Sequence, residues 1–153
     1  MPSDNDFAYL AGIIDGEGCI GVYPTAYAWY RATLTVGSTS KDLIVWLHDN
    51  FGGSVHNASR AGQYGNNKAN QAWQMSGKKL ATLLERVEPL LIIKKNQSVL
   101  AREFLSTLTK TPALGLSKEV LVRRGEIAAE FKVLNKRGLY SLIIRTLGKS
   151  HNN

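Results

Sequence analysis

The chain has 153 residues, enough for one domain with a sizeable hydrophobic core. Nineteen lysines and arginines against twelve acidic residues give a formal net charge of +7, which suggests an anionic partner such as nucleic acid but also fits an unspecialised basic protein. The single cysteine excludes an intrachain disulfide or an all-cysteine zinc site, and no apolar run approaches the roughly 20 residues of a membrane span.

The N-terminal part predicts a helix followed directly by a strand. The helix is expected from Asn5 to Ile14, with Asp4 or Asn5 as its N-cap. A short apolar strand is expected from Cys19 to Tyr23, where the proline that follows ends it.

A second strand and a helix are expected next. The segment from Tyr27 to Gly37 alternates between Tyr30, Ala32, Leu34 and Val36 on one face and Trp29, Arg31, Thr33 and Thr35 on the other. A helix is predicted from Lys41 to Asn50. Thr39 and Asp42 are spaced as its capping box, and Gly52 and Gly53 are expected to end it.

The remaining chain predicts a second hairpin and three helices. Strands are expected over 54–59 and 71–76, joined by a loop rich in glycine and asparagine, and helices over 78–88, 94–109 and 117–135. This order predicts an α+β fold with an αββαββα core, a curved antiparallel four-stranded sheet and added C-terminal helices. We expect a single domain over 1–153, with the core at about 5–110 and a helical extension at about 111–153.

The stretch LAGIIDGEG, residues 10–18, carries the most chemical information in the sequence. Asp15 and Glu17 lie where the first helix should end, and the helix dipole disfavours negative charge there. A partner group or a bound cation should therefore compensate these acids. A carboxylate beside free backbone carbonyls suits Mg²⁺, whereas solvated acids at an ordinary helix–strand turn would give the same pattern. Gly12 would let another helix approach closely.

These nine residues resemble the signature of the LAGLIDADG homing endonucleases. Six of the nine positions are identical, and Glu17 keeps the acid of a seventh. The predicted element order also agrees with that family over about residues 5–110. A second segment, PLLIIKKNQ at 89–97, resembles the one that delivers a basic residue to the active site in single-motif members.

The resemblance implies a metal-dependent nuclease. Glu17 and the carbonyl of Gly16 would bind Mg²⁺, with Mn²⁺ or Ca²⁺ able to occupy the same site, and Lys94 would assist catalysis or, in a plainer role, contact solvent or phosphate. Relatives often place a glutamine after the second strand to order water. Ser40 stands there in this chain and could equally cap a helix, while Ile44 stands at a downstream basic position.

One motif per chain implies a homodimer that cleaves a long, nearly palindromic double-stranded DNA target across the minor groove. The dimer interface implied by the resemblance comprises Leu10, Ala11, Gly12, Ile13 and Asp15.

The outer face of the predicted sheet is the expected DNA-binding surface. Arginine and glutamine can each read a base through two hydrogen bonds in the major groove, although a solvated sheet face would have a similar composition. The expected DNA-binding residues are Tyr23, Trp29, Arg31, Thr33, Thr35, His56, Asn70, Gln74 and Ser76.

Three alternatives remain open from the sequence. The chain could be an RNA maturase of the same family, a catalytically silent nucleic-acid-binding relative, or an unrelated metabolic protein with a chance motif. The N-terminus lacks the features of a secretory signal, so an intracellular protein is expected. An organelle, chloroplast or mitochondrion, and the prokaryotic cytoplasm are not distinguished, because a transit peptide could already have been cleaved.

Overall fold

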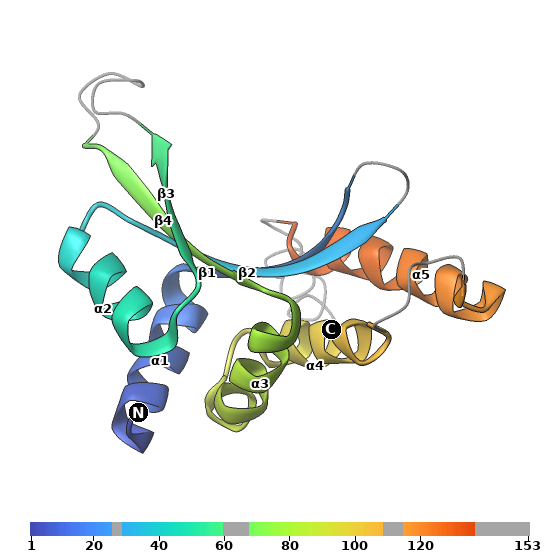
Figure 1. The fold of residues 1–153 in the computed structure, drawn as a ribbon, viewed down its shortest axis with the longest axis horizontal. Coiled ribbons are helices and arrows are strands. Elements are labelled where there is room, and N and C mark those ends of the chain that lie inside the picture. Colours follow the sequence, from blue (N-terminus) through green and yellow to red (C-terminus); the bar gives the residue numbers. More distant parts are fainter. Residues whose placement is uncertain (26–28, 60–67, 109–114, 137–153) are drawn as a thin grey trace, which may run out of the picture.

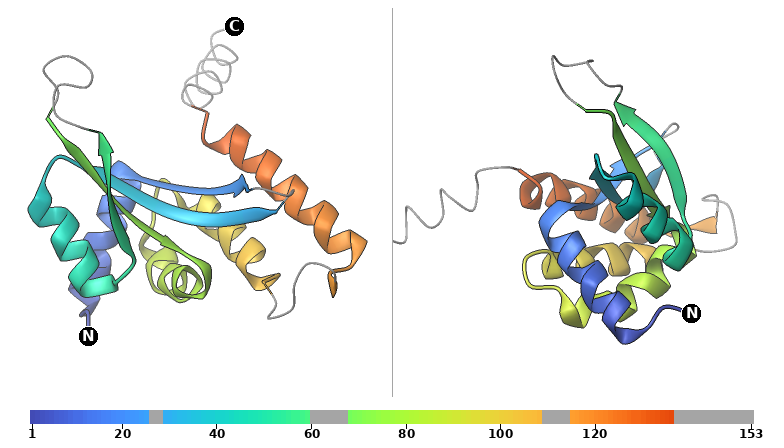
Figure 2. Two further views of the ribbon diagram at one scale, coloured as in Figure 1. Left: turned by 45° about the horizontal axis from the view of Figure 1, so that its top comes forward. Right: turned by 90° about the vertical axis from the view of Figure 1, so that its left-hand side faces the viewer.

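A curved antiparallel sheet with helices packed on one face organises the chain (Figure 1). The computed structural model describes residues 1–25, 29–59, 68–108 and 115–136. Helices α1 to α4 lie together on one side of the sheet, and the opposite face of the strands is open (Figure 2). The α+β architecture and the helix–hairpin–helix–hairpin order predicted from the sequence are confirmed.

Helix α1 (Asp4–Glu17) runs further than the sequence predicted, and strand β1 (Gly18–Pro24) follows without a loop. Its N-cap is Ser3, so the expectation of Asp4 or Asn5 is wrong. The Ser3 side chain accepts a hydrogen bond from the Asp6 N–H, and the Asp6 carboxylate accepts from the Ser3 N–H at 2.7 Å. This reciprocal pair satisfies two otherwise free donors at the helix start.

The sheet has the strand order β1-β2-β4-β3, and all neighbours are antiparallel. Strand β2 (Tyr30–Ser38) pairs with both β1 and β4 (Asn70–Ser76), while β3 (Ser54–Ser59) lies at the far edge. The predicted alternation is confirmed on the inner face, because Ala32, Leu34 and Val36 are 0–2% exposed under the helices.

Helix α2 (Lys41–Phe51) has Ser40 as its N-cap. The Ser40 Oγ accepts a hydrogen bond from the Leu43 N–H at 3.4 Å. The expected capping box of Thr39 and Asp42 is therefore wrong. The glycine stop is confirmed, since Gly52 and Gly53 have φ angles of 73° and 89°. A Cβ on Gly53 would also lie 2.7 Å from the Gln74 carbonyl oxygen, which explains why glycine occupies that position.

The remaining helices close the core. They are α3 (Gly77–Val87), the short 3₁₀ helix η2 (Glu88–Leu90), α4 (Lys95–Ser106) and α5 (Lys118–Leu134). Ile127 and Phe131 of α5 belong to the same hydrophobic cluster as α1. Leu121 of the same helix is 46% exposed, whereas Arg124 is buried. Arg124 fits there because its guanidinium donates to the Thr107 hydroxyl at 2.8 Å and to the Thr107 carbonyl.

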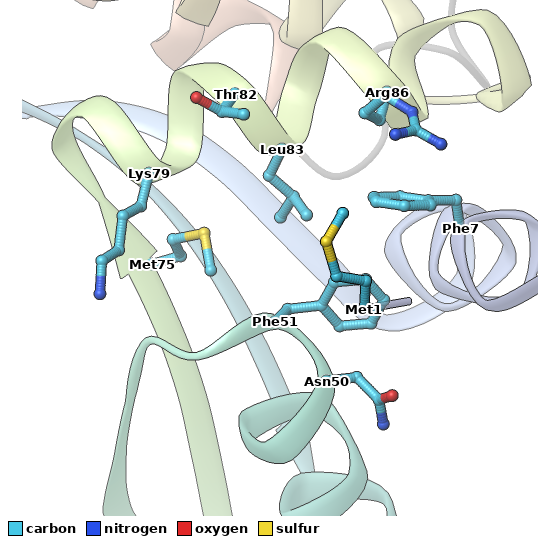
Figure 3. A pocket seen from close by; sticks show the side chains of 9 residues that line it. All are labelled: Met1, Phe7, Asn50, Phe51, Met75, Lys79, Thr82, Leu83 and Arg86. Atoms are coloured by element: carbon cyan, nitrogen blue, oxygen red, sulfur yellow. The ribbon is translucent and has the colours of Figure 1, made fainter. Parts of the chain in front are cut away.

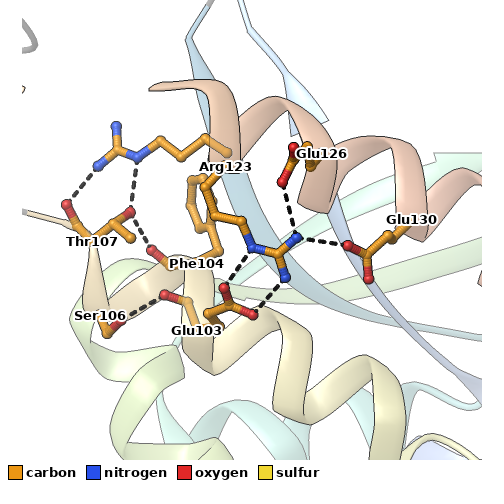
Figure 4. Close-up of polar contacts among 8 residues, drawn as sticks. Glu103, Phe104, Ser106, Thr107, Arg123, Glu126 and Glu130 are labelled. Carbon is orange, nitrogen blue, oxygen red and sulfur yellow. Dashed lines mark hydrogen bonds and ion pairs between the residues drawn. The ribbon is translucent and has the colours of Figure 1, made fainter. Parts of the chain in front are cut away.

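Side-chain hydrogen bonds and ion pairs connect α5 to α4 and to the edge of the sheet. The Arg123 guanidinium donates to both carboxylate oxygens of Glu103 at 2.7 and 3.0 Å and also contacts Glu126 and Glu130 (Figure 4). The hydrogen bond from Arg123 lowers the pKa of Glu103. At the other end, the Asn135 amide donates to the Ile20 carbonyl at 2.9 Å. Helix α5 therefore takes up a free backbone group of the edge strand β1.

Candidate active site and nucleic-acid interface

The C-terminal end of α1 is joined to the segment between η2 and α4 through Asp15. The Asp15 carboxylate accepts hydrogen bonds from the backbone N–H groups of Ile92 at 2.8 Å, Ile93 at 3.2 Å and Lys94 at 2.9 Å. Partial burial acts to raise the pKa of Asp15, but these hydrogen bonds and the Lys94 charge outweigh it and lower the pKa. The first acid of the motif is therefore compensated by three backbone donors.

The side chain of Lys94 also binds the C-terminal end of α1. Its ammonium group donates to the carbonyl oxygens of Ile14 at 2.8 Å and of Asp15 at 2.6 Å. These carbonyls belong to the last turn of α1, where the helix dipole favours positive charge, and the Ile14 carbonyl also accepts a hydrogen bond from the Gly18 N–H. An ammonium has three donors, so one remains available for water or phosphate. The family resemblance predicted Lys94 near this end of α1, but it did not predict that Lys94 would cap the helix.

Glu17 is the motif acid that remains exposed. It is the last residue of α1, directly before β1, and Gly16 beside it is exposed as well. Among the described residues, no three His, Cys, Asp or Glu side chains lie together as a metal cluster. This donor set fits Mg²⁺, which binds by one or two carboxylates plus substrate phosphates, and it does not fit an all-protein cage. Glu17 and the Gly16 carbonyl are the groups that would hold the ion.

Fewer residues of α1 are exposed than the expected dimer interface requires. Leu10 and Ala11 are 0% and 2% exposed in the core of the chain itself, so their expected place in a dimer interface is not available to them. Gly12 and Gly16 are exposed, and a Cβ on either would meet no atom of the described residues within 4 Å. Ile13 is half-buried. The outward stripe of α1 is therefore built around two glycines.

The open face of the sheet carries most of the residues expected to bind DNA. Cross-strand pairs place Arg31 opposite Tyr23 and Thr35 opposite Gln74. Thr33 is the exception, because it is only 6% exposed and cannot reach a duplex from this conformation. The other expected residues are exposed or half-buried: Tyr23, Trp29, Arg31, Thr35, His56, Asn70, Gln74 and Ser76.

Ser40 lies in the connection between β2 and α2. Its hydroxyl is used as the N-cap of α2, and its N–H donates to the Ser38 hydroxyl at 3.0 Å. Ser40 therefore has a structural role, and a part in ordering catalytic water stays a prediction.

An apolar pocket of about 370 Å³ lies on the helical side of the molecule (Figure 3). Phe7, Phe51 and Leu83 line it from three different helices, with Arg86 beside the Phe7 ring. It adjoins the N-terminal half of α1, whereas Glu17 is at the other end of that helix. The pocket is therefore no part of the site at the motif.

The fold matches solved structures of DNA endonucleases. The homing endonuclease I-CvuI, in complex with its target in the presence of calcium, superposes with a TM-score of 0.70 and 24% identity over 87% of this chain and 83% of that chain. An archaeal intron-encoded homing endonuclease complexed with DNA gives 0.71 and 20% identity over 88% and 87%. The LAGLIDADG meganuclease I-AabMI, bound to uncleaved DNA, gives 0.67 and 17% over 87% of this chain but only 47% of its own.

The chain thus has the fold of the LAGLIDADG homing endonucleases, the family that its motif resembles. No family model matches the sequence, and no curated protein matches it. No described helix has the length and apolar character needed to cross a membrane.

Proposed function

We propose that this protein is a site-specific homing endonuclease that cleaves double-stranded DNA as a homodimer. The target is long and nearly palindromic, and hydrolysis of one phosphodiester on each strand across the minor groove leaves short 3′ overhangs. The gene lies within an intron. The observation that carries the proposal is the exposed Glu17 at the end of a motif helix whose other acid is already fully compensated.

The proposed chemistry depends on the different roles of the two motif acids, Asp15 and Glu17. Asp15 and Lys94 hold the end of α1 through hydrogen bonds, and the exposed Glu17 is the last residue of that helix, directly before β1. A divalent ion held there with a DNA phosphate would neutralise developing charge and favour water as the nucleophile. The remaining Lys94 donor can orient water or a phosphate oxygen, and the basic surface attracts the duplex.

Cleavage of randomised duplexes tests the proposal directly. The protein is incubated with Mg²⁺ and a library of randomised duplexes, and the product ends are sequenced. We expect one enriched, nearly palindromic site with a constant stagger. Ends indistinguishable from those of a protein-free control would contradict the proposal.

The homodimer is supported by the single motif and by length. This chain covers about half of I-AabMI, so two copies approach the length of that protein. We expect Gly12→Leu to yield a monomer that no longer makes double-strand breaks, because the side chain separates two closely packed helices. A Cβ at Gly12 has no atom within 4 Å among residues 1–25, 29–59, 68–108 and 115–136, so the fold of this part should be unaffected.

Light scattering with and without DNA measures the oligomeric state of the Gly12 variants. Gly12→Ala is the control, since a methyl group changes the helix spacing far less. A wild-type protein that stays monomeric even on its DNA target would contradict the homodimer.

Lys94→Met should slow the chemical step by roughly 10²-fold with little change in DNA affinity, the size of effect typical of a positioned proton-transfer or charge-stabilising group. It should also lower the melting temperature, because the carbonyls of Ile14 and Asp15 lose the hydrogen bonds that the Lys94 ammonium donates. Single-turnover rates under saturating protein measure the first effect. Lys95→Met is the matched control, since Lys95 is the exposed neighbour. An unchanged rate with a lowered melting temperature would leave Lys94 a purely structural cap.

Arg31→Ala should relax base preference at two symmetric positions of the target. Arg31 is exposed on the open face, and a bidentate contact discriminates by about 1–3 kcal/mol, hence roughly 2–6 kcal/mol for two copies if they add. Cleavage of every single-base variant of the site measures this. Lys118→Ala, which removes a positive charge at the start of α5, is the control. A uniform loss across all variants would mean that Arg31 contacts the DNA backbone instead.

A catalytically silent nucleic-acid-binding protein, or an RNA maturase, is the alternative function. The observation that favours this alternative is the Lys94 ammonium, which caps α1. This structural role alone explains a lysine at position 94, without any part in catalysis. Recovery of protein-bound duplexes from the same library, beside the sequencing of cut ends, separates the endonuclease from a silent DNA-binding protein, which would enrich a bound duplex without producing cut ends.

A further inference from the structure

Three residues of β1 share the open face of the sheet near the motif. Cys19, Gly21 and Tyr23 alternate with the buried Ile20 and Val22 and therefore point outward. The strand register sets them opposite residues of β2 that were expected to read DNA, with Gly21 opposite Thr33 and Tyr23 opposite Arg31.

The Tyr23 side chain does not extend away from the sheet but lies back along its own strand. A Cβ built on Gly21 would come within 2.5 Å of the Tyr23 Cζ and Oη atoms, so the far end of the ring rests on the glycine. The Tyr23 hydroxyl then reaches Cys19, with 3.4 Å between Oη and Sγ. The absence of a side chain at Gly21 is what makes room for this arrangement.

The ring lies on the cross-strand neighbour of the buried Thr33. Thr33 is on the outward side of β2, yet it is 6% exposed, and its cross-strand neighbour is the glycine on which the ring lies. Tyr23 itself is 46% exposed. At this point of the open face a duplex would therefore meet the tyrosine ring and not the threonine hydroxyl.

The hydroxyl of Tyr23 is directed along β1 to the Cys19 sulfur. Burial, with smaller contributions from the hydrogen bond and charge of Cys19, raises the pKa of Tyr23 to about 12, so the phenol is neutral at physiological pH. Its hydroxyl is engaged with the Cys19 sulfur. The surface left for DNA is the apolar ring, and the apolar feature of the major groove is the 5-methyl group of thymine.

We infer that Tyr23, seated on Gly21, is a specificity-determining residue that selects thymine through its methyl group and removes Thr33 from base contact. The inference rests on the proposed function, because it assigns one contact within the proposed DNA interface. In a homodimer the contact occurs once in each half-site.

The test compares thymine with deoxyuridine, which differs only by that methyl group. On the duplex selected by the wild-type protein, deoxyuridine at one symmetric pair of positions should reduce affinity and cleavage roughly fourfold per half-site, the effect of one apolar carbon. Tyr23→Phe should keep this discrimination, and Tyr23→Ala should lose it. Gly21→Ala should lose it too, although Tyr23 is retained, because the added methyl displaces the ring.

Thr33 supplies the second measurement. Thr33→Ala should leave the base profile of the wild-type protein unchanged and should alter it in the Tyr23→Ala background, where the threonine is uncovered. An unchanged profile for Tyr23→Ala, or an effect of Thr33→Ala alone as large as that of Tyr23→Ala, would overturn the inference. Binding to the selected duplex is measured beside cleavage, so a protein that binds and does not cut refutes the endonuclease and still decides the role of Tyr23.

Discussion

Glu17→Gln should abolish DNA cleavage while leaving DNA binding intact or tighter. The substitution keeps the shape of the side chain and removes the only exposed carboxylate of the motif. Charge stabilisation by a bound metal is worth several kcal/mol in the transition state, so a loss on the order of 10³-fold is expected. Affinity should not fall, because a negative charge facing DNA phosphates is removed.

Cleavage and binding of the selected duplex, measured at the same ionic strength, test this expectation. Glu119→Gln is a matched control, because it neutralises another exposed glutamate, at the start of α5 and outside the motif. Cleavage at the wild-type rate by the Glu17 variant would remove Glu17 from the active site.

Asp15→Ala should cause a far larger loss of stability than the removal of Glu17, the other acid of the motif. Three backbone N–H groups lose their acceptor, and the Lys94 ammonium loses a nearby opposite charge. Hydrogen bonds to a charged group contribute about 1.5–3 kcal/mol each, but Asp15 is only partly buried and water can replace part of them. We expect a decrease of about 2–3 kcal/mol in the free energy of unfolding at neutral pH.

The pH dependence of this loss identifies its cause. The pKa of Asp15 is lower in the folded chain than its unfolded value of about 3.9, so its stabilising contribution is present above that pH. The contribution is lost as the pH falls through the folded pKa, where the carboxylate is protonated. The difference between wild type and Asp15→Ala, measured by urea unfolding, should therefore be constant near neutrality and shrink below about pH 4.

Asp49→Ala is the control for that series. Asp49 is exposed, and its recorded partner is the neighbouring His48, so its removal should change stability by no more than about 0.5 kcal/mol. An equal effect of the two substitutions would mean that the three backbone hydrogen bonds contribute nothing to the folded state.

Periodicity and turn residues predicted the fold well because each is a local signal. Strand β3 has the expected bounds, and the inner face of β2 follows the expected alternation. Helix caps were predicted poorly because several Ser, Thr and Asp residues stand side by side at each start. The backbone path chooses among them, as it does for Ser3 and Ser40.

The candidate site was only partly predictable for a different reason. The two motif acids could be singled out by residue type, but the partners of Asp15 are backbone N–H groups, which every sequence possesses. Alternation placed Thr33 on the outer face correctly and could not reveal that Thr33 is buried there, opposite the glycine on which Tyr23 lies. The catalytic roles of Glu17, Lys94 and Ser40 stay predictions.

The link between Asp15 and Lys94 also bears on the order in which the protein folds. Its hydrogen bonds join residues 77 to 80 positions apart, across both hairpins and α3. Contacts of such high sequence separation carry a large loop-closure cost and form after the local hairpins and helices. During synthesis, which proceeds from the N-terminus, a chain that has not yet emerged beyond residue 94 contains the complete motif without the segment that supports it. Nascent and truncated chains should therefore be inert, and the proposed nuclease activity should arise only with the near-complete fold.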